Sequence, residues 1–141
     1  MKVMAIDYGD ARTGVAVSDE SASIAGAAWV IHEKEQCATA QAIIAEAAAH
    51  CVDVIVIGYP KNMDGSVGPR AKKSEHLAEF FRGQLDIEVV LWDERMTTIS
   101  AHRILTSTGR HGKKRKNTID AVAASLILES YLQYLKKSSN L

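Results

Sequence analysis

Acidic residues at three places far apart in the chain lie where they could act together. Asp7 ends the apolar run "VMAID", and Asp93 and Glu94 directly follow the apolar run "IEVVLW". Asp120 lies near the start of a helical pattern, in "NTIDAVAASLIL". In an open α/β sheet, ligands gather beyond the carboxyl ends of the strands. If the two strands are parallel neighbours and the last helix starts at the same edge, three carboxylates meet there.

Such a cluster of carboxylates is suited to one kind of chemistry. Held within a few ångströms, the carboxylates repel one another unless a cation neutralises them. Because oxygen ligands select hard cations, we expect Mg²⁺ or Mn²⁺ in preference to Zn²⁺. Two such ions, about 3.5–4 Å apart, support in-line attack at a phosphodiester, one activating water and the other stabilising the leaving oxygen. The acids therefore indicate a phosphodiester hydrolase with two metal ions.

Each acid also has a simpler explanation. An aspartate at a strand end, such as Asp7, often caps a helix or forms a turn. Asp120 could interact only with the dipole of its helix. In "DER", one of the two acids could pair with Arg95 at the surface. The metal-site hypothesis rests on the convergence of the acids, which a sequence does not show.

The elements that must position these acids follow from apolar patterns and turns. We expect strands at 2–7, 12–18, 25–32, 52–57 and 87–92, and helices at 37–51, 70–83 and 97–109, with a last helix from about Thr118. Gly83 and Gly109 would end two of the helices. The turn "YGDA" makes the first two strands a hairpin, and "VDVIVI" is typical of a strand covered on both faces. The fold class is therefore α/β, a mixed five-stranded sheet flanked by helices, in a single domain spanning residues 1–141.

Composition places the chain among ordinary globular proteins of the cytoplasm. Apolar residues make up 47% and charged residues 24%. Cys37 and Cys51 match neither a C-x-x-C pair nor a disulfide framework, so we expect buried free thiols. The strand-like N-terminus does not resemble a signal peptide. No apolar run approaches the roughly 18 residues of a membrane span, so we expect no contact with a membrane.

Charge is distributed unevenly although the net charge is zero. Residues 1–66 carry four Lys/Arg and nine Asp/Glu, whereas residues 67–141 carry thirteen and eight. Much of the positive excess lies in "RHGKKRK", residues 110–116, which we expect to be a loop. Such a focused basic loop indicates an anionic partner, although a merely solvated loop is the simpler alternative.

The motifs together resemble a known family. "AIDYGDARTGVAVSD", "GYPKNMDGSVGPRA", "LWDERMTT" and "KKRKNTIDAVAASLILESYL" occur in the order and spacing of the YqgF family. Its members are bacterial RNase H-like proteins related to RuvC-type Holliday junction resolvases and described as pre-16S rRNA nucleases. The resemblance implies an RNase H-like fold and a catalytic metal site at Asp7, Glu94 and Asp120. It also implies that the first strand centres the sheet and pairs with the strand that holds the second acid.

Further residues of the motifs would contact the substrate. The loop motif of the family falls on Asn62, Asp64 and Gly65, which we interpret as substrate contacts or supports of the metal ligands. Gly9 would leave room for a phosphate or a water near the backbone, although a role in the turn alone explains it equally well. Tyr59 stands where the family commonly has leucine, and its ring could stack on a base.

Basic residues would hold the nucleic-acid backbone without reading its sequence. Such contacts predict binding that weakens steeply with salt. We find no RNA-binding sheet motif and no DNA-reading helix, so recognition of shape or of a junction is expected. His111 could assist proton transfer, although a solvated loop histidine is the simpler explanation. The proposed backbone contacts are Arg95, Arg110, Lys113, Lys114, Arg115 and Lys116.

The expected function is hydrolysis of structured nucleic acid, with processing of the 5′ end of precursor 16S rRNA in ribosome biogenesis as the first hypothesis. A Holliday junction resolvase would use the same acids and would need a dimer; the chain itself leaves monomer or homodimer open. A nucleotide-binding protein is a further alternative, because "DYGDARTGVAVSD" also resembles the phosphate loop of actin-like ATPases and sugar kinases. A non-catalytic RNA- or ribosome-binding module is the last alternative, and the presence of all three acids argues against it.

Overall fold

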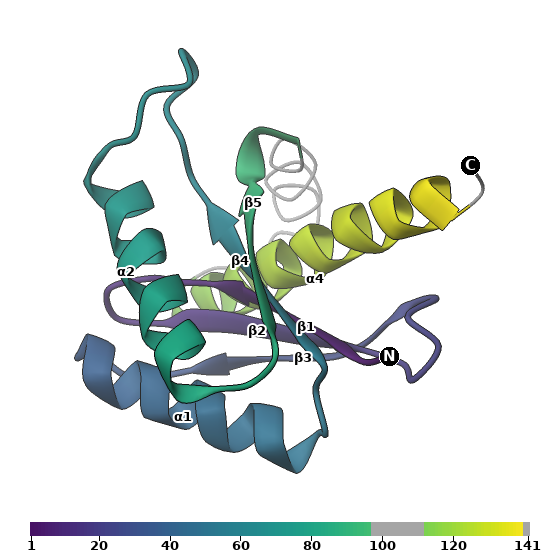
Figure 1. Cartoon of the computed structure of the whole chain (residues 1–141). Coiled ribbons are helices and arrows are strands. Elements are labelled where there is room, and N and C mark those ends of the chain that lie inside the picture. Colours follow the sequence, from purple (N-terminus) through teal and green to yellow (C-terminus); the bar gives the residue numbers. More distant parts are fainter. Residues whose placement is uncertain (97–111, 140–141) are drawn as a thin grey trace.

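The protein contains a mixed five-stranded sheet with helices on both faces (Figure 1). The structure is a computed structural model that describes residues 1–96 and 112–139; side chains are described for residues 1–95 and 118–138. The strands are β1 (Val3–Asp7), β2 (Thr13–Ser18), β3 (Ala25–Ile31), β4 (Val54–Tyr59) and β5 (Glu88–Asp93). The helices are α1 (Gln36–Ala49), α2 (Pro69–Gln84), the 3₁₀ turn η1 (Glu94–Met96) and α4 (Gly112–Ser139).

The strand order is β3-β2-β1-β4-β5, with β1 at the centre. β1 pairs antiparallel with β2, as the short turn between them predicts, and parallel with β4. β4 in turn pairs parallel with β5. The carboxyl ends of β1, β4 and β5 therefore lie at one rim of the sheet, which confirms the predicted fold class.

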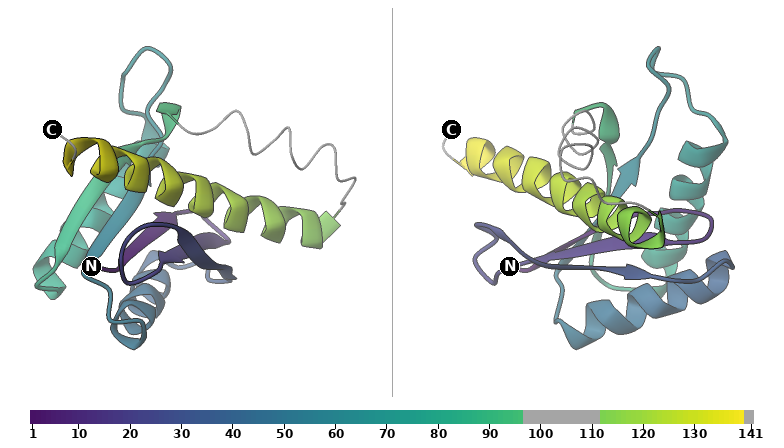
Figure 2. Two further views of the ribbon diagram at one scale, coloured as in Figure 1. Left: turned by 90° about the vertical axis from the view of Figure 1, so that its right-hand side faces the viewer. Right: turned by 180° about the vertical axis from the view of Figure 1, so that it is seen from behind.

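Two apolar cores cover the two faces of the sheet. On one face, α1 and α2 pack over a core that includes Met4, Ile43 and Phe81, all fully buried. On the other face, α4 is the described helix that crosses the strands (Figure 2). Leu128 and Ala5 belong to the buried core on that face. Because side chains of a strand alternate between faces, β1 contributes to both cores and is held rigidly up to its last residue.

The prediction that the strand before Glu94 pairs with β1, which the resemblance implied, was wrong. Glu94 follows β5, but β5 pairs with β4, so one whole strand lies between the strand that ends in Asp7 and the strand that precedes Glu94. Neighbouring strands lie about 4.8 Å apart, so β1 and β5, with β4 between them, are separated by about 10 Å. The Glu94 side chain must therefore cross the end of β4 to approach Asp7.

Other boundaries differ from the predictions for local reasons. α4 begins at Gly112, before the predicted start near Thr118, because lysine and arginine are good helix formers and continue the helix through the basic run. Gly83 lies inside α2 and does not end it; the cap is Leu85, whose N–H donates to the carbonyl of Phe81. Cys37 and Cys51 are free, as predicted, but exposed, because Cys51 lies in the turn after α1.

The predicted helix at 97–109 lies outside the described residues. None of the helices that the structure describes is both long and apolar enough to cross a membrane.

Candidate functional site

The parallel strands β1, β4 and β5 end at one rim of the sheet, and Asp7 and Glu94 meet there. Asp7 is the last residue of β1, and Glu94 is the first residue of η1, directly after β5. The two carboxyl groups share a side-chain hydrogen bond. The structure therefore brings together two of the three acids that the sequence singles out, from opposite sides of β4.

This contact changes the ionisation of both acids. Burial, and after it the negative charges of Glu94 and Asp120, raise the pKa of Asp7 to about 8, although the charge of Arg70 acts in the opposite direction. Burial also raises the pKa of Glu94, against the lowering effects of the hydrogen bond with Asp7 and of Arg70. Near neutral pH and without a cation, Asp7 keeps its proton and donates it to Glu94 in a hydrogen bond.

A glycine in β4 lets Glu94 reach Asp7. A Cβ atom added at Gly58 would lie 2.9 Å from Cδ of Glu94 and 2.8 Å from Cδ1 of Ile127. Both distances are shorter than carbon atoms tolerate, so any larger residue would displace the side chain of Glu94 or of Ile127. Because Gly58 has no side chain, the side chain of Glu94 can pass across the end of β4 at this position.

Asp120 approaches the same rim from α4 and is held by Arg12. Nε of Arg12 donates to Oδ2 of Asp120 over 2.9 Å, and both side chains are partly buried. A Cβ atom at Gly14 would lie 2.0 Å from the carbonyl oxygen of Asp120, so β2 and α4 touch backbone to backbone there. The negative charge of Asp120 reaches Asp7 and contributes to its raised pKa. Asp120 thus faces the acid pair, but its carboxylate is bound to an arginine.

The donor set fits a hard divalent cation, although it is not closed in this conformation. Contact between two partly buried carboxyl groups favours the binding of a cation. The cation removes the repulsion between the two carboxylates and replaces the proton that they share. All donors are oxygens, as Mg²⁺ and Mn²⁺ prefer. Among the described residues, however, no three His, Cys, Asp or Glu side chains lie close enough to hold one ion. Asp120 would have to leave Arg12, or share its carboxylate with it, to join the pair.

Arg95 distinguishes the two acids of "DER". Its guanidinium binds Asp93 with Nε at 2.9 Å and Nη2 at 2.6 Å from Oδ2. This pairing lowers the pKa of Asp93 and keeps that acid at the surface, which leaves Glu94 to turn inward. Nη1 of Arg95 also donates to the carbonyl of Met63 over 3.4 Å, so Arg95 ties η1 to the loop after β4.

The loop motif is held by its own polar side chains. Oδ1 of Asp64 accepts hydrogen bonds from the backbone N–H and the hydroxyl of Ser66, which lower the pKa of Asp64. Nδ2 of Asn62 donates to the same hydroxyl over 2.9 Å. Gly65 has a φ of 88°, a conformation that side chains disfavour. Asn62, Asp64 and Gly65 therefore shape a loop that projects beyond the site (Figure 1).

Two predicted contacts also have structural roles at the rim. A Cβ atom at Gly9 would lie 2.3 Å from the carbonyl oxygen of Arg12, so the turn itself requires a glycine. The hydroxyl of Tyr59 donates to Glu75 of α2, and Nζ of Lys61 lies 5.3 Å from the centre of its ring. One face of the Tyr59 ring is therefore already in contact with a cation.

The predicted basic contacts are placed only in part. Arg110 and His111 lie outside the described residues, and so do the side chains of the first turns of α4. The backbone places Lys113, Lys114, Arg115 and Lys116 in the helix that leads to Asp120, and not in a loop.

Sequence reasoning missed three residues that shape the site. Gly58 interrupts a β-branched run, and an isolated glycine inside a strand is a signal of close approach by another group. Arg12 lies in the motif "AIDYGDARTGVAVSD", but nothing local links it to Asp120, 108 residues away. Arg70 lies near both buried acids, and its proximity is a product of the fold alone.

Comparison with known proteins identifies the family of the chain. The model of the RuvX family, described as Holliday junction resolvase, matches residues 1–134. A Halothermothrix orenii protein named "Putative pre-16S rRNA nuclease" is 44% identical over 137 residues, which cover 97% of this chain and 98% of that protein. A protein of the same name from Caldanaerobacter subterraneus subsp. tengcongensis is 42% identical and covers 98% and 100%.

Solved structures show the same fold at low identity. Thermus thermophilus RuvC superposes with a TM-score of 0.56 at 12% identity, covering 95% of this chain and 96% of that one. The fowlpox virus resolvase in complex with Holliday junction DNA gives 0.57 at 11% identity, covering 96% and 99%. The fold is thus the RNase H-like fold of these resolvases. Because the family model spans almost the whole chain and its relatives exceed 40% identity, the protein belongs to the RuvX family, also called YqgF.

Proposed function

We propose that this protein is a Mg²⁺- or Mn²⁺-dependent nuclease that processes the 5′ end of precursor 16S rRNA. The observation that carries the proposal is the contact between Asp7 and Glu94, two partly buried acids whose pKa values burial raises and between which Asp7 donates a hydrogen bond. The names of the relatives and of the family support a nucleic acid as substrate. The catalytic and metal-binding residues of this proposal are Asp7, Glu94 and Asp120.

Each acid has a defined task in this proposal. When bound, a pair of Mg²⁺ or Mn²⁺ ions would supply an activated water and neutralise the leaving oxygen. Asp7, fixed at the end of a buried strand, would give up the proton that it donates to Glu94, and the two carboxylates would then hold the ions. Arg12 orients the carboxylate of Asp120 toward the same rim. The loop and basic residues singled out above would position the phosphate backbone: Gly9, Asn62, Asp64, Arg95, Arg110, Lys113, Lys114, Arg115 and Lys116.

The cellular setting completes the proposal. Residues 1–141 act as a single domain in the cytoplasm, where precursor rRNA and the assembling ribosome are the partners. The chain works on RNA as a monomer or a homodimer. A monomer suffices because cleavage of one strand needs only one site, and each subunit of a homodimer would carry such a site.

The test is cleavage of a precursor 16S rRNA transcript with Mn²⁺, Mg²⁺ or EDTA. Wild type should cut near the 5′ end with either metal, and Asp7→Asn should lose at least about 100-fold of the rate. Asp53→Asn is the matched control, because Asp53 accepts a hydrogen bond from the Lys2 N–H at the opposite rim and asparagine keeps an acceptor. Equal cleavage by wild type and Asp7→Asn would point to a contaminating nuclease and contradict the proposal.

A second candidate is resolution of four-way DNA junctions, favoured by the family description and by the fold of the fowlpox resolvase. A resolvase cuts two symmetric strands and needs a dimer. Paired cleavage of a synthetic four-way junction by a species of twice the chain mass would favour this candidate over the RNA nuclease.

A further inference from the structure

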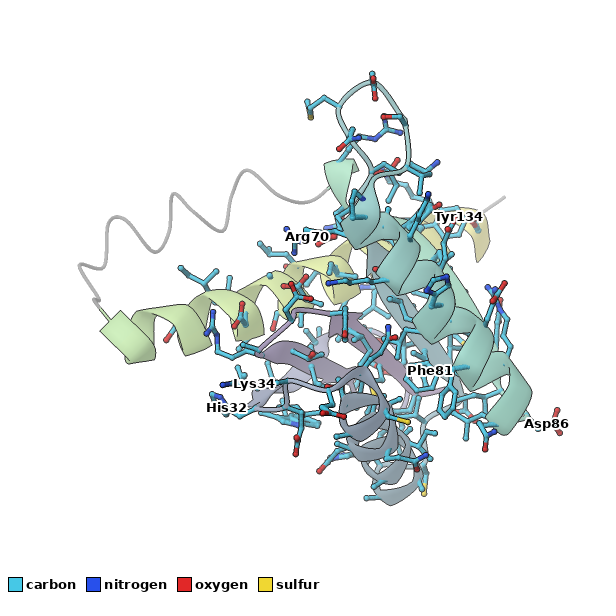
Figure 3. The ribbon with its side chains drawn as sticks, turned by 90° about the vertical axis from the view of Figure 1, so that its left-hand side faces the viewer. His32, Lys34, Arg70, Phe81, Asp86 and Tyr134 are labelled. Atoms are coloured by element: carbon cyan, nitrogen blue, oxygen red, sulfur yellow. The ribbon has the colours of Figure 1, made fainter. Side chains whose placement is uncertain are left out.

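Arg70 is a basic residue at the rim, beside the candidate site. It is exposed, and among the residues whose side chains the structure describes it makes no salt bridge. Figure 3 shows it at the N-terminal end of α2. Three other basic side chains at the rim each bind an acid: Arg12 binds Asp120, Lys73 binds Asp10, and Arg95 binds Asp93.

Arg70 nevertheless lies close to the acid pair. Among the residues whose side chains are described, it is the cation whose charge lowers the pKa of both Asp7 and Glu94. It also lines a pocket of about 130 Å³ with Tyr8, Gly9, Asp10 and Lys73. That volume is well above the ~15 Å³ that one water molecule requires. Because Tyr8 directly follows Asp7 in the chain, the pocket lies beside the acid pair.

The pocket carries a net positive charge. Lys73 and Asp10 neutralise each other, since Nζ lies 2.6 Å from Oδ1. Arg70 then contributes one positive charge that no acid of the pocket lining balances. The partial positive charge of the α2 N-terminus adds to it, because the N-cap residue, Gly68, supplies no side-chain acceptor. An anion is the ligand that this combination favours.

The first turn of α2 is fixed in place. Pro69 occupies the first turn, and Ala71 and Ser74 are buried at 0% and 2% exposure. Arg70 thus projects from a rigid segment. A guanidinium whose backbone attachment is fixed can bind two phosphate oxygens at once.

We propose that Arg70 binds a phosphate of the nucleic acid adjacent to the scissile bond, in the pocket formed with Tyr8 and Lys73, and so positions the substrate on Asp7 and Glu94. This inference rests on the proposed nuclease function. The alternative is that Arg70 serves only to balance the buried acids. In that case its removal would change their ionisation but not the affinity for nucleic acid.

Binding separates the two roles without any cleavage. The protein is used in an Asp7→Asn background with EDTA, and the probes are a fluorescent RNA hairpin and a fluorescent four-way DNA junction. Arg70→Ala should reduce the slope of log K against log salt by about 0.7–0.9, the loss of one phosphate contact. Lys72→Ala, on the same turn but not lining the pocket, is the matched control and should leave the slope nearly unchanged. Equal slopes in both variants would overturn the inference, whether or not they differ from the parent.

Cleavage provides the second measurement in the otherwise wild-type chain. At saturating protein, Arg70→Ala should slow single-turnover cleavage by about 10- to 100-fold, because one charge-assisted contact beside the reacting phosphate is lost. Arg70→Lys should keep the salt slope but recover only part of the rate, since lysine lacks the planar fork. An unchanged rate in Arg70→Ala would contradict the inference while leaving the nuclease proposal intact. If wild type cuts nothing, the nuclease proposal fails, and the salt slope still decides whether Arg70 binds phosphate.

Discussion

At the scale of single residues, the site is built around two acids that the fold forces into contact. Burial removes the water that would stabilise each carboxylate, and the proximity of the two acids adds repulsion between their negative charges. The chain responds by keeping a proton on Asp7, whose pKa rises to about 8. A cation can replace that proton, so the same geometry that is unfavourable at high pH without metal is suited to binding one.

This arrangement predicts how stability depends on pH in the absence of metal. The pKa of Asp7 is about 8 in the folded protein against 3.8 as its ordinary value, so between about pH 4 and 8 the folded state binds more protons than the unfolded state. The free energy of unfolding must therefore fall as pH rises through this range and level off above it. From pH 5 to 8.5, wild type should lose on the order of a few kcal/mol.

Urea unfolding in EDTA at the two pH values measures this loss. Asp7→Asn carries no titrating group there and should lose clearly less, whereas Asp53→Asn should behave as wild type. A wild-type loss no greater than that of Asp7→Asn would show that Asp7 ionises freely.

The residue scale also shows what sequence can and cannot predict. Asp7 and Glu94 are recognisable because each follows an apolar run, which is a local pattern. Which acid of "DER" turns inward is not local: it depends on Arg95 binding Asp93 and on space at Gly58. The link between Arg12 and Asp120 spans 108 residues and could only come from the fold.

At the scale of elements, β4 separates the strands that carry the acids. All five strands follow from apolar runs and turns, because those signals are local. The order of the strands does not, and the expected pairing between the strand of Asp7 and the strand before Glu94 was wrong for that reason. The early start of α4 was missed because a basic run is compatible with both a loop and a helix.

The position of β4 predicts different results for two glycine substitutions. In Gly58→Ala the new Cβ would lie within 3 Å of both Glu94 and Ile127, so we expect a loss of about 1–3 kcal/mol in stability. Displacement of Glu94 should also reduce cleavage by at least about tenfold. Gly83→Ala is the matched control: it lies in α2 with nothing within 4 Å of its Cβ, and it should stabilise by about 0.5–1 kcal/mol.

Chemical unfolding and single-turnover cleavage would measure both effects. If Gly58→Ala keeps wild-type cleavage, Glu94 reaches the site by another route and Gly58 is not the passage.

At the scale of the whole molecule, the site joins parts of the chain that are far apart in sequence. The acidic N-terminal half supplies Asp7, and the C-terminal half supplies Glu94 and Asp120. β1 lies in the centre of the sheet and α4 packs across it, so the geometry of the site depends on the complete fold. Metal binding must then be linked to global stability, because the unfolded chain cannot hold the acids together.

This linkage predicts a metal-dependent melting temperature. At pH 7.5, Mn²⁺ at about 100 times its dissociation constant should stabilise wild type by about 2.7 kcal/mol. For a domain of this size, that corresponds to a rise of roughly 10 °C. Asp7→Asn and Glu94→Gln should each lose most of the rise, since each removes one of the two acids in contact.

Asp120→Asn decides whether the third acid joins the ion. Its carboxylate binds Arg12 over 2.9 Å, so in this conformation it is not committed to a metal. If Asp120 remains with Arg12, Asp120→Asn should keep the full rise in melting temperature with Mn²⁺. If the ion draws Asp120 away from Arg12, the rise should shrink as it does in Asp7→Asn, and Arg12→Ala should then enhance it, because the competing cation is gone. Calorimetry of these variants with and without Mn²⁺ would separate a two-acid site from a three-acid site.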